Sequence, residues 1–135
     1  MRIAFGTDEH TDLTASIVDS LRELGHEVVV DVEDKPWPDV GRRVGEAVVE
    51  GEADRGVVCC WTGTGVSIAA NKVDGVRAAL CTDAETARGA RRWNDANVLA
   101  LGLRLTSPIV AREMLEAFLG TEPDPDERET IARVS

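Results

Sequence analysis

The sequence has no run of about 18 apolar residues, so we expect no membrane-spanning helix. It has three cysteines and no C-x-x-C spacing, which argues against a zinc site or a disulfide framework and for a reducing cytoplasm. Clustered His, Asp and Glu ligands are missing as well, so neither a metal nor an organic cofactor is expected. Basic residues are few, 15 against 25 acidic ones, and the net charge of −10 disfavours nucleic acid and anionic membranes as partners.

Of the 135 residues, 43% are hydrophobic and 30% are charged, which is typical of a soluble globular protein with one domain over residues 1–135. The chain leads directly into a strand without a signal-peptide pattern, which also favours a cytoplasmic location. Apolar runs predict strands at residues 2–6, 26–32, 56–60, 76–81 and 98–102. Apolar spacing and capping residues predict helices at residues 13–24, 39–50 and 83–92, helices opening near residue 65 and at residue 108, and a terminal helix at 127–134. This alternation predicts an α/β fold, a three-layer α/β/α sandwich on a five-stranded parallel, Rossmann-like sheet.

The middle of the chain, residues 56–72, combines a buried strand, a glycine loop and the start of a helix. Backbone N–H groups of such a loop, together with the helix N-terminus, suit an oxyanion. Two nucleotide-binding motifs fail here, because Ile68 stands where a dinucleotide fingerprint needs its third glycine and no Gly-Lys-Ser/Thr follows. A cysteine phosphatase loop fails too, since no arginine occurs between Cys60 and Lys72.

Three longer patterns then resemble one known family. They are C-x-T-G-x-G-x-S-I-A-A-N-K at residues 60–72, V-x-G-V-R-A-A-L at 73–80 and N-D-A-N-V-L-x-L-G-x-R at 94–104. Together they are similar to the ribose-5-phosphate isomerase B / galactose-6-phosphate isomerase family. The resemblance implies a cofactor-independent aldose–ketose isomerase of a phosphorylated sugar, working through an enediolate. It also implies a homodimer or tetramer with shared active sites, in which the terminal helix packs on a neighbouring subunit.

Cys60 is the candidate base, because it ends the central strand beside a helix N-terminus that favours the thiolate form. Strand alternation points Cys59 and Cys60 to opposite sides, so at most one should reach a pocket, and the alternative is that both are inert core residues. The resemblance places the family's cysteine base here, whereas a second subgroup has a glutamate at the position of Val66. The enediolate oxygens are expected to meet the Thr62 hydroxyl and the loop amides, those of Gly63, Thr64, Gly65, Val66 and Ser67.

The resemblance implies five further substrate contacts. Asp8 and Asn94 match residues that touch the sugar, although each is also a plausible turn or capping residue. Arg104, Arg128 and Arg133 are the candidate phosphate anchors, since the guanidinium fork suits phosphate. The terminal arginines are fewer and differently spaced than is usual in the family, and Arg128 is equally consistent with a solvated surface residue.

One departure bears on the substrate. Members acting on ribose 5-phosphate have a ring-opening histidine immediately before N-D-A-N-V, and this chain has Trp93, which has no proton to deliver in that way. Trp61 adds further bulk where the family has glycine. Both favour a substrate that needs no ring opening, such as a tetrose or tetrulose 4-phosphate. The alternative is a non-catalytic sugar-phosphate-binding relative, or the partner subunit of a hetero-oligomer.

Overall fold

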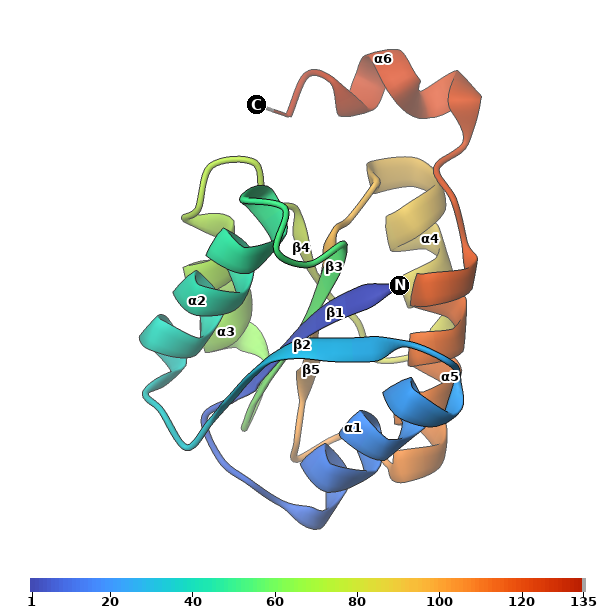
Figure 1. Ribbon diagram of the computed structural model, residues 1–135. Helices are drawn as coiled ribbons and strands as arrows, with labels where there is room; N and C mark the ends of the chain where they lie inside the picture. The colour runs from blue at the N-terminus through green and yellow to red at the C-terminus, as the bar shows by residue number, and fades with distance from the viewer. Residues whose placement is uncertain (135) are drawn as a thin grey trace.

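The computed structural model describes residues 1–134 (Figure 1). Five parallel strands form one sheet in the order β2-β1-β3-β5-β4, which confirms the predicted α/β fold and its five-stranded parallel sheet. The strands are β1 (Arg2–Thr7), β2 (Glu27–Glu33), β3 (Arg55–Cys60), β4 (Ala78–Leu80) and β5 (Val98–Gly102). The helices are α1 (Asp12–Glu23), α2 (Trp37–Val49), α3 (Thr64–Asn71), α4 (Ala84–Asn94), α5 (Pro108–Gly120) and α6 (Arg128–Ile131), with a 3₁₀ turn at Pro125–Glu127.

Helices cover both faces of the sheet, α2 and α3 on one side and α1, α4 and α5 on the other (Figure 1). The central strand β3 is buried along its whole length, as a parallel strand between two helical layers must be. Its side chains alternate between the two hydrophobic cores. Val57 and Cys59 join the core beneath α1, α4 and α5, whereas Val58 and Cys60 join the core beneath α2 and α3.

The α2/α3 layer is held close by a glycine. A Cβ atom added to Gly41 of α2 would lie 2.6 Å from the Cβ of Ala69 and 2.8 Å from the carbonyl oxygen of Val66, both on α3. Any side chain at position 41 therefore forces the two helices apart. Because α3 directly follows the glycine loop at residues 61–63, this contact sets how far that loop stands from the sheet.

Most elements differ from the predicted bounds by one or two residues, and the differences at β4, α2 and the terminal helix have a physical reason. β4 is shorter than residues 76–81 because the Arg77 N–H donates to the Asn97 side chain and the Val76 N–H to the carbonyl of Val73, so both amides are used in a turn. α2 begins at Trp37 because Pro38 is tolerated in the first helical turn. The terminal helix expected at 127–134 is a 3₁₀ turn followed by one short α-helical turn, α6.

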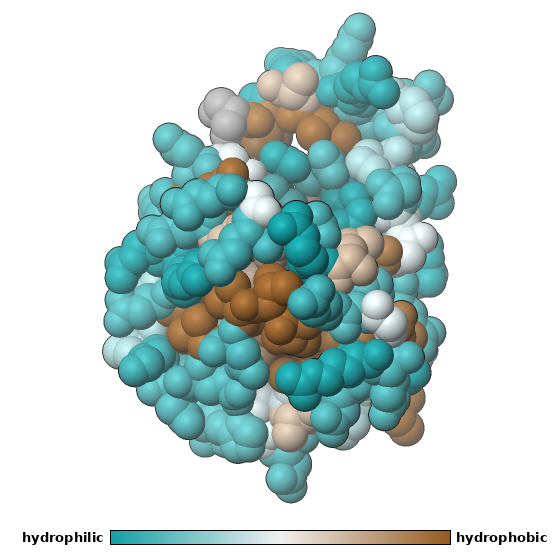
Figure 2. Space-filling model, in the orientation of Figure 1, coloured by the Kyte–Doolittle hydropathy of each residue, from teal (hydrophilic) through white to brown (hydrophobic). Residues whose placement is uncertain are grey.

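The surface beside the edge strand β2 is apolar. Figure 2 shows hydrophobic residues gathered over the middle of this strand, whose valines are mostly half-buried rather than covered. Within residues 1–134, no helix combines the length and the apolar character that crossing a bilayer requires.

Candidate active site

Cys60 ends β3 at the carboxyl edge of the sheet, where parallel α/β folds bind their ligands. Its side chain is 5% exposed, and that of Cys59 is fully buried on the opposite face. The neighbouring segment after β5 fixes the chain here, since the Leu103 N–H donates to the Cys60 carbonyl at 2.9 Å and the Arg104 N–H to the Trp61 carbonyl at 3.0 Å. Arg104 therefore lies on the same edge as Cys60.

The two other thiols have pKa values that suit inert core residues. Complete burial raises the pKa of Cys59 far above its usual range, with smaller contributions from Cys60 and Asp8. Burial also raises the pKa of Cys81 to about 11, helped by Asp83. At neutral pH both thiols are protonated, which suits core residues and not a base.

The glycine loop after Cys60 packs against the end of β5. Gly63 has a left-handed backbone with φ of 79°, and a Cβ atom there would lie 2.8 Å from the carbonyl carbon of Leu101. A Cβ atom on Gly102 would in turn lie 2.7 Å from the Thr62 carbonyl oxygen. The loop thus needs glycine on both sides of this contact.

α3 begins directly after this loop, and Gly63 gives its first turn no side-chain cap, although the Thr64 N–H donates to the Thr62 hydroxyl at 3.5 Å. Thr62 and Thr64 share a hydrogen bond of 2.7 Å between their hydroxyls at the same point, and both residues are exposed. Uncapped amides and two hydroxyls are the groups that an oxyanion needs. The Val66 side chain is fully buried, so only its backbone N–H can contact a ligand. Ser67, the next residue of α3, is half-buried.

Trp37 covers the start of α3. Its ring lies so close to Gly65 that a Cβ atom there would be 2.9 Å from Cδ2. The ring is nevertheless 43% exposed, and together with Ile68 and Lys72 it lines a cavity of about 300 Å³. The tryptophan therefore packs on the oxyanion loop from outside and holds it in place.

Asp8 directly follows β1, next to β3 on the same edge. Its N–H donates to the carbonyl of Cys59 at 3.3 Å, and its Oδ1 atom is buried without a hydrogen-bonding partner among residues 1–134. Burial, with repulsion from Glu9, raises the pKa of this carboxyl group. A buried carboxylate oxygen without a partner can accept a hydroxyl group of a ligand.

His10 lies two residues after Asp8 in the chain, and its hydrogen bonds go to the end of β2 and the residue after it. Its Nδ1 lies 2.7 Å from Oε1 of Glu33, and its N–H donates to Oδ1 of Asp34 at 3.0 Å. The hydrogen bond to Glu33 is the main reason why the pKa of His10 is raised, so this histidine carries more positive charge at neutral pH than a free one.

The remaining predicted residues lie at the opposite edge of the sheet. α4 runs back against the strand direction, so Trp93 and Asn94 at its end lie near the start of β5. Arg128 and Asp95 line one cavity of about 430 Å³, which places the terminal segment there as well, and Figure 1 shows α6 at this end of the molecule. The length of β3, roughly 16 Å from its first to its last residue, separates the two groups. One chain therefore brings Asp8, Cys60, the loop and Arg104 together, but not Asn94, Arg128 or Arg133 with them.

Trp93 is fixed against its own helix. Its ring lies over Gly89, where a Cβ atom would be 2.7 Å from Cζ3, and the Arg92 guanidinium carbon lies 5.9 Å from the ring centroid. The ring is 54% exposed and lines, with Asn94, a cavity of about 560 Å³ between β4 and α4. This tryptophan is an open wall of a cavity rather than a core residue.

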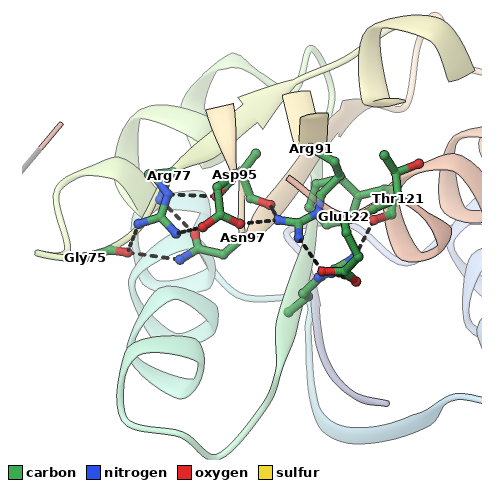
Figure 3. A network of polar contacts seen from close by, with 10 residues as sticks. Gly75, Arg77, Arg91, Asp95, Asn97, Thr121 and Glu122 are labelled. Atoms are coloured by element: carbon green, nitrogen blue, oxygen red, sulfur yellow. Dashed lines mark hydrogen bonds and ion pairs between the residues drawn. The ribbon is translucent and has the colours of Figure 1, made fainter. Parts of the chain in front are cut away.

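The sequence patterns predicted no role for a group of ion-paired residues at this opposite edge, which are Arg55, Arg77, Arg91, Asp95 and Glu122 (Figure 3). Two signals could have found them. Arg55 is a charged residue at the start of an otherwise apolar strand, and Asp95 follows a helix at a position that favours a left-handed backbone.

These features define a parallel α/β protein with a thiol and a glycine loop at the carboxyl edge of its sheet. A family model described as Ribose/Galactose Isomerase matches residues 3–135, and the chain belongs to this family. The D-erythrulose-4-phosphate isomerase of Pectobacterium atrosepticum is 40% identical over 129 residues, covering 90% of this chain and 84% of that protein. Galactose-6-phosphate isomerase subunit LacB of Clostridium acetobutylicum is 38% identical over 130 residues, covering 93% and 75%.

A solved structure agrees with these relatives. Ribose-5-phosphate isomerase B of Clostridium thermocellum superimposes with a TM-score of 0.90 at 38% identity, covering 99% of this chain and 95% of that one. The predicted family and enzyme class are therefore confirmed, and the chain is a sugar-phosphate isomerase.

Proposed function

We propose that this enzyme interconverts a tetrulose 4-phosphate and its aldose isomer, with Cys60 as the base. The observation that carries the choice of substrate is Trp93, which is exposed and fixed over Gly89. It stands where ribose-specific members have their ring-opening histidine. A tetrulose 4-phosphate cannot close a furanose ring because its O4 carries the phosphate, so it needs no such acid. The erythrulose-4-phosphate isomerase among the relatives supports this choice.

In the proposed reaction the Cys60 thiolate removes a proton from C1 of the ketose, and the electron pair moves to form a C1–C2 enediolate. The negative charge on O2 is then stabilised by the Thr62 hydroxyl and by first-turn amides of α3, to which Gly63 gives no side-chain cap. The Cys60 thiol returns the proton to C2, and a hydroxyl proton passes from O1 to O2. The products are the aldose and the regenerated thiolate.

The site is proposed to form between two copies of the chain. Cys60, the loop and Asp8 come from the carboxyl edge of one copy, and Asn94, Arg128 and Arg133 come from the opposite edge of the other. The separation of the two groups along β3 supports this, because a sugar phosphate of four carbons is far shorter than the roughly 16 Å between them. The exposed arginines then supply positive charge to a protein whose net charge is −10.

The test is steady-state kinetics with C4, C5 and C6 sugar phosphates, using the native enzyme and Cys60→Ala. We expect erythrulose 4-phosphate to have the highest kcat/KM and Cys60→Ala to lose at least about a thousandfold in kcat. Cys81→Ala is the matched control and should keep its activity. A preference for ribose 5-phosphate would remove the Trp93 argument, and an active Cys60→Ala variant would remove the base.

Alkylation gives an independent test. Iodoacetamide should modify Cys60 first, since the raised pKa values of Cys59 and Cys81 keep those thiols protonated. Peptide mapping should show one alkylated residue, with inactivation at the same rate and protection by erythrulose 4-phosphate. Alkylation that leaves activity intact would show that Cys60 takes no part in the reaction.

A further inference from the structure

A cluster of buried charges lies at the edge of the sheet opposite Cys60. Arg55 and Arg91 are 7% and 3% exposed, and each guanidinium carbon lies 5.8 Å from the centroid of the Phe118 ring. Two cations around one ring repel each other, and burial with the nearby Arg91 lowers the pKa of Arg55. Such an arrangement persists only where anions and carbonyl groups compensate it.

The first compensating anion ends α4. Asp95 has a left-handed backbone with φ of 48°, and its two carboxylate oxygens face different arginines. Oδ1 accepts from Arg91 at 2.8 Å, and Oδ2 accepts from Arg77 at 3.2 Å (Figure 3). Arg77 also donates to the Asp95 carbonyl at 2.7 Å. The residue directly after Asn94 is thus held from both sides.

The second anion lies in the segment that leads to the C-terminal arginines. Glu122 accepts from Arg55 at 3.1 Å and lies 3.8 Å from Arg91, although its side chain is 77% exposed. The same arginines hold the neighbouring backbone, since Arg91 donates to the Thr121 carbonyl at 3.0 Å and Arg55 to the Phe118 carbonyl at 2.6 Å.

Arg91 therefore connects the end of α4 to the start of the terminal segment. A backbone hydrogen bond of 2.9 Å from the Asp124 N–H to the Arg92 carbonyl runs beside it. On one side of Arg91 is Asp95, which follows Asn94, and on the other is Glu122, six residues before Arg128. Asn94 and Arg128 are the residues that the proposed function assigns to the substrate.

We propose that Arg91, Asp95 and Glu122 are positioning residues that hold Asn94 and Arg128 in one fixed arrangement for the active site of a second copy of the chain. This rests on the proposed function. Asp95 sets the position of the Asn94 end, which contacts the sugar. Glu122 sets the position of the α6 end, which contacts the phosphate. Substitutions at Asp95 and at Glu122 are therefore expected to affect different parts of the reaction.

The first variant is Glu122→Gln, which keeps the shape of an exposed side chain and removes its charge. We expect inorganic phosphate, titrated by calorimetry, to bind this variant about threefold to tenfold more weakly than the native protein, and KM for erythrulose 4-phosphate to rise equally with kcat nearly unchanged. The matched control is Glu52→Gln, which removes a surface ion pair with Arg43 of similar geometry, 3.1 Å and 3.2 Å, and should change neither value.

The second variant is Asp95→Gly. Glycine adopts the left-handed backbone without strain, so a purely conformational role predicts full activity, whereas the proposal predicts that kcat falls by about tenfold or more. Unchanged phosphate affinity and KM in Glu122→Gln, or full activity in Asp95→Gly, would overturn the proposal. Failure of the proposed function appears separately, as a native enzyme without turnover, and the phosphate titration then still decides the role of Glu122.

Discussion

At the scale of single residues, the site depends on which of two adjacent thiols faces the ligand edge. Alternation along the strand was enough to predict that Cys59 and Cys60 point to opposite faces, and the structure confirms this. The orphan oxygen of Asp8 could not have been predicted, because local sequence does not reveal which carboxylate lacks a partner. Its surroundings depend on β3, which is about fifty residues away in the chain.

Trp93→His restores the acid that ribose-specific members use. We expect kcat/KM for ribose 5-phosphate to rise by about tenfold or more, since a histidine there can protonate the ring oxygen. Trp93→Phe is the control, because it reduces the size of the ring without adding an acid. Equal gains in both variants would show that pocket size, and not ring opening, decides the substrate.

Asp31 should make stability depend on pH in an unusual direction. Burial and Glu33 raise the pKa of Asp31 from 3.8 to about 6, with Arg22 and His10 opposing this. The unfolded chain thus loses this proton at lower pH than the folded one. Folding stability therefore falls as pH rises from about 4 to about 6 and stays lower above that range.

Asp31→Asn should raise the melting temperature at pH 7, by the equivalent of less than about 1 kcal/mol because the group is largely solvated, and should change it little at pH 4. Asp54→Asn is the opposite control. Hydrogen bonds from Arg2 lower the pKa of Asp54, so its stabilisation is present above pH 3.8 and is lost as pH falls through the lower, folded value. That variant should melt earlier at pH 7. The gain in melting temperature of Asp31→Asn over the native protein should be larger at pH 7 than at pH 4. A larger gain at pH 4 would contradict the raised pKa of Asp31.

At the scale of elements, the predictions are best where a local signal fixes both ends. The strand at residues 98–102 and the helix start at Pro108 are confirmed residue for residue, because an apolar run and a proline at the first helical position are local features. β4 and the terminal helix are shorter than predicted. In β4 the Arg77 amide is used by the distant Asn97 side chain, whereas the terminal segment is a 3₁₀ turn capped locally by Asp124 and then a short helix.

Gly41→Ala tests the close packing of α2 on α3. The new methyl group would meet backbone atoms of α3 at 2.8 Å, and we expect the free energy of unfolding in urea to fall by about 1–3 kcal/mol. Gly120→Ala is the control, since nothing in residues 1–134 lies within 4 Å of its Cβ position, and a helical alanine should stabilise by about 0.5–1 kcal/mol. A Gly41→Ala variant as stable as the native protein would show that the two helices can separate freely.

At the scale of the whole molecule, residue patterns predicted the fold, whereas the expectation of a divided site came from the family resemblance alone. The motifs with Asn94 and with Cys60 are close in sequence, and only the reversed direction of α4 shows that they lie at opposite edges. The length of α4 explains this separation, because its eleven residues rise about 16 Å and carry the chain back to the opposite edge of the sheet.

Mixing two inactive variants tests whether two copies build one site. Cys60→Ala and Asn94→Ala, dissociated together and reassembled in equal amounts, should recover about a quarter of the native activity, because half of the dimers are mixed and each has one intact site. Each variant reassembled alone is the control. No recovery from a mixture that has formed mixed dimers, shown by differently tagged chains, would place the whole site within one copy.

The contact between the Thr62 carbonyl and Gly102 has a consequence for engineering this enzyme. Libraries designed for new sugars commonly vary every position near a nucleophile, yet a Cβ atom at 63 or 102 would collide with backbone that has no room to move. Diversity is better placed at Trp61 and Trp93, which are 59% and 54% exposed. Side chains there can be exchanged without rebuilding the loop that makes the chemistry possible.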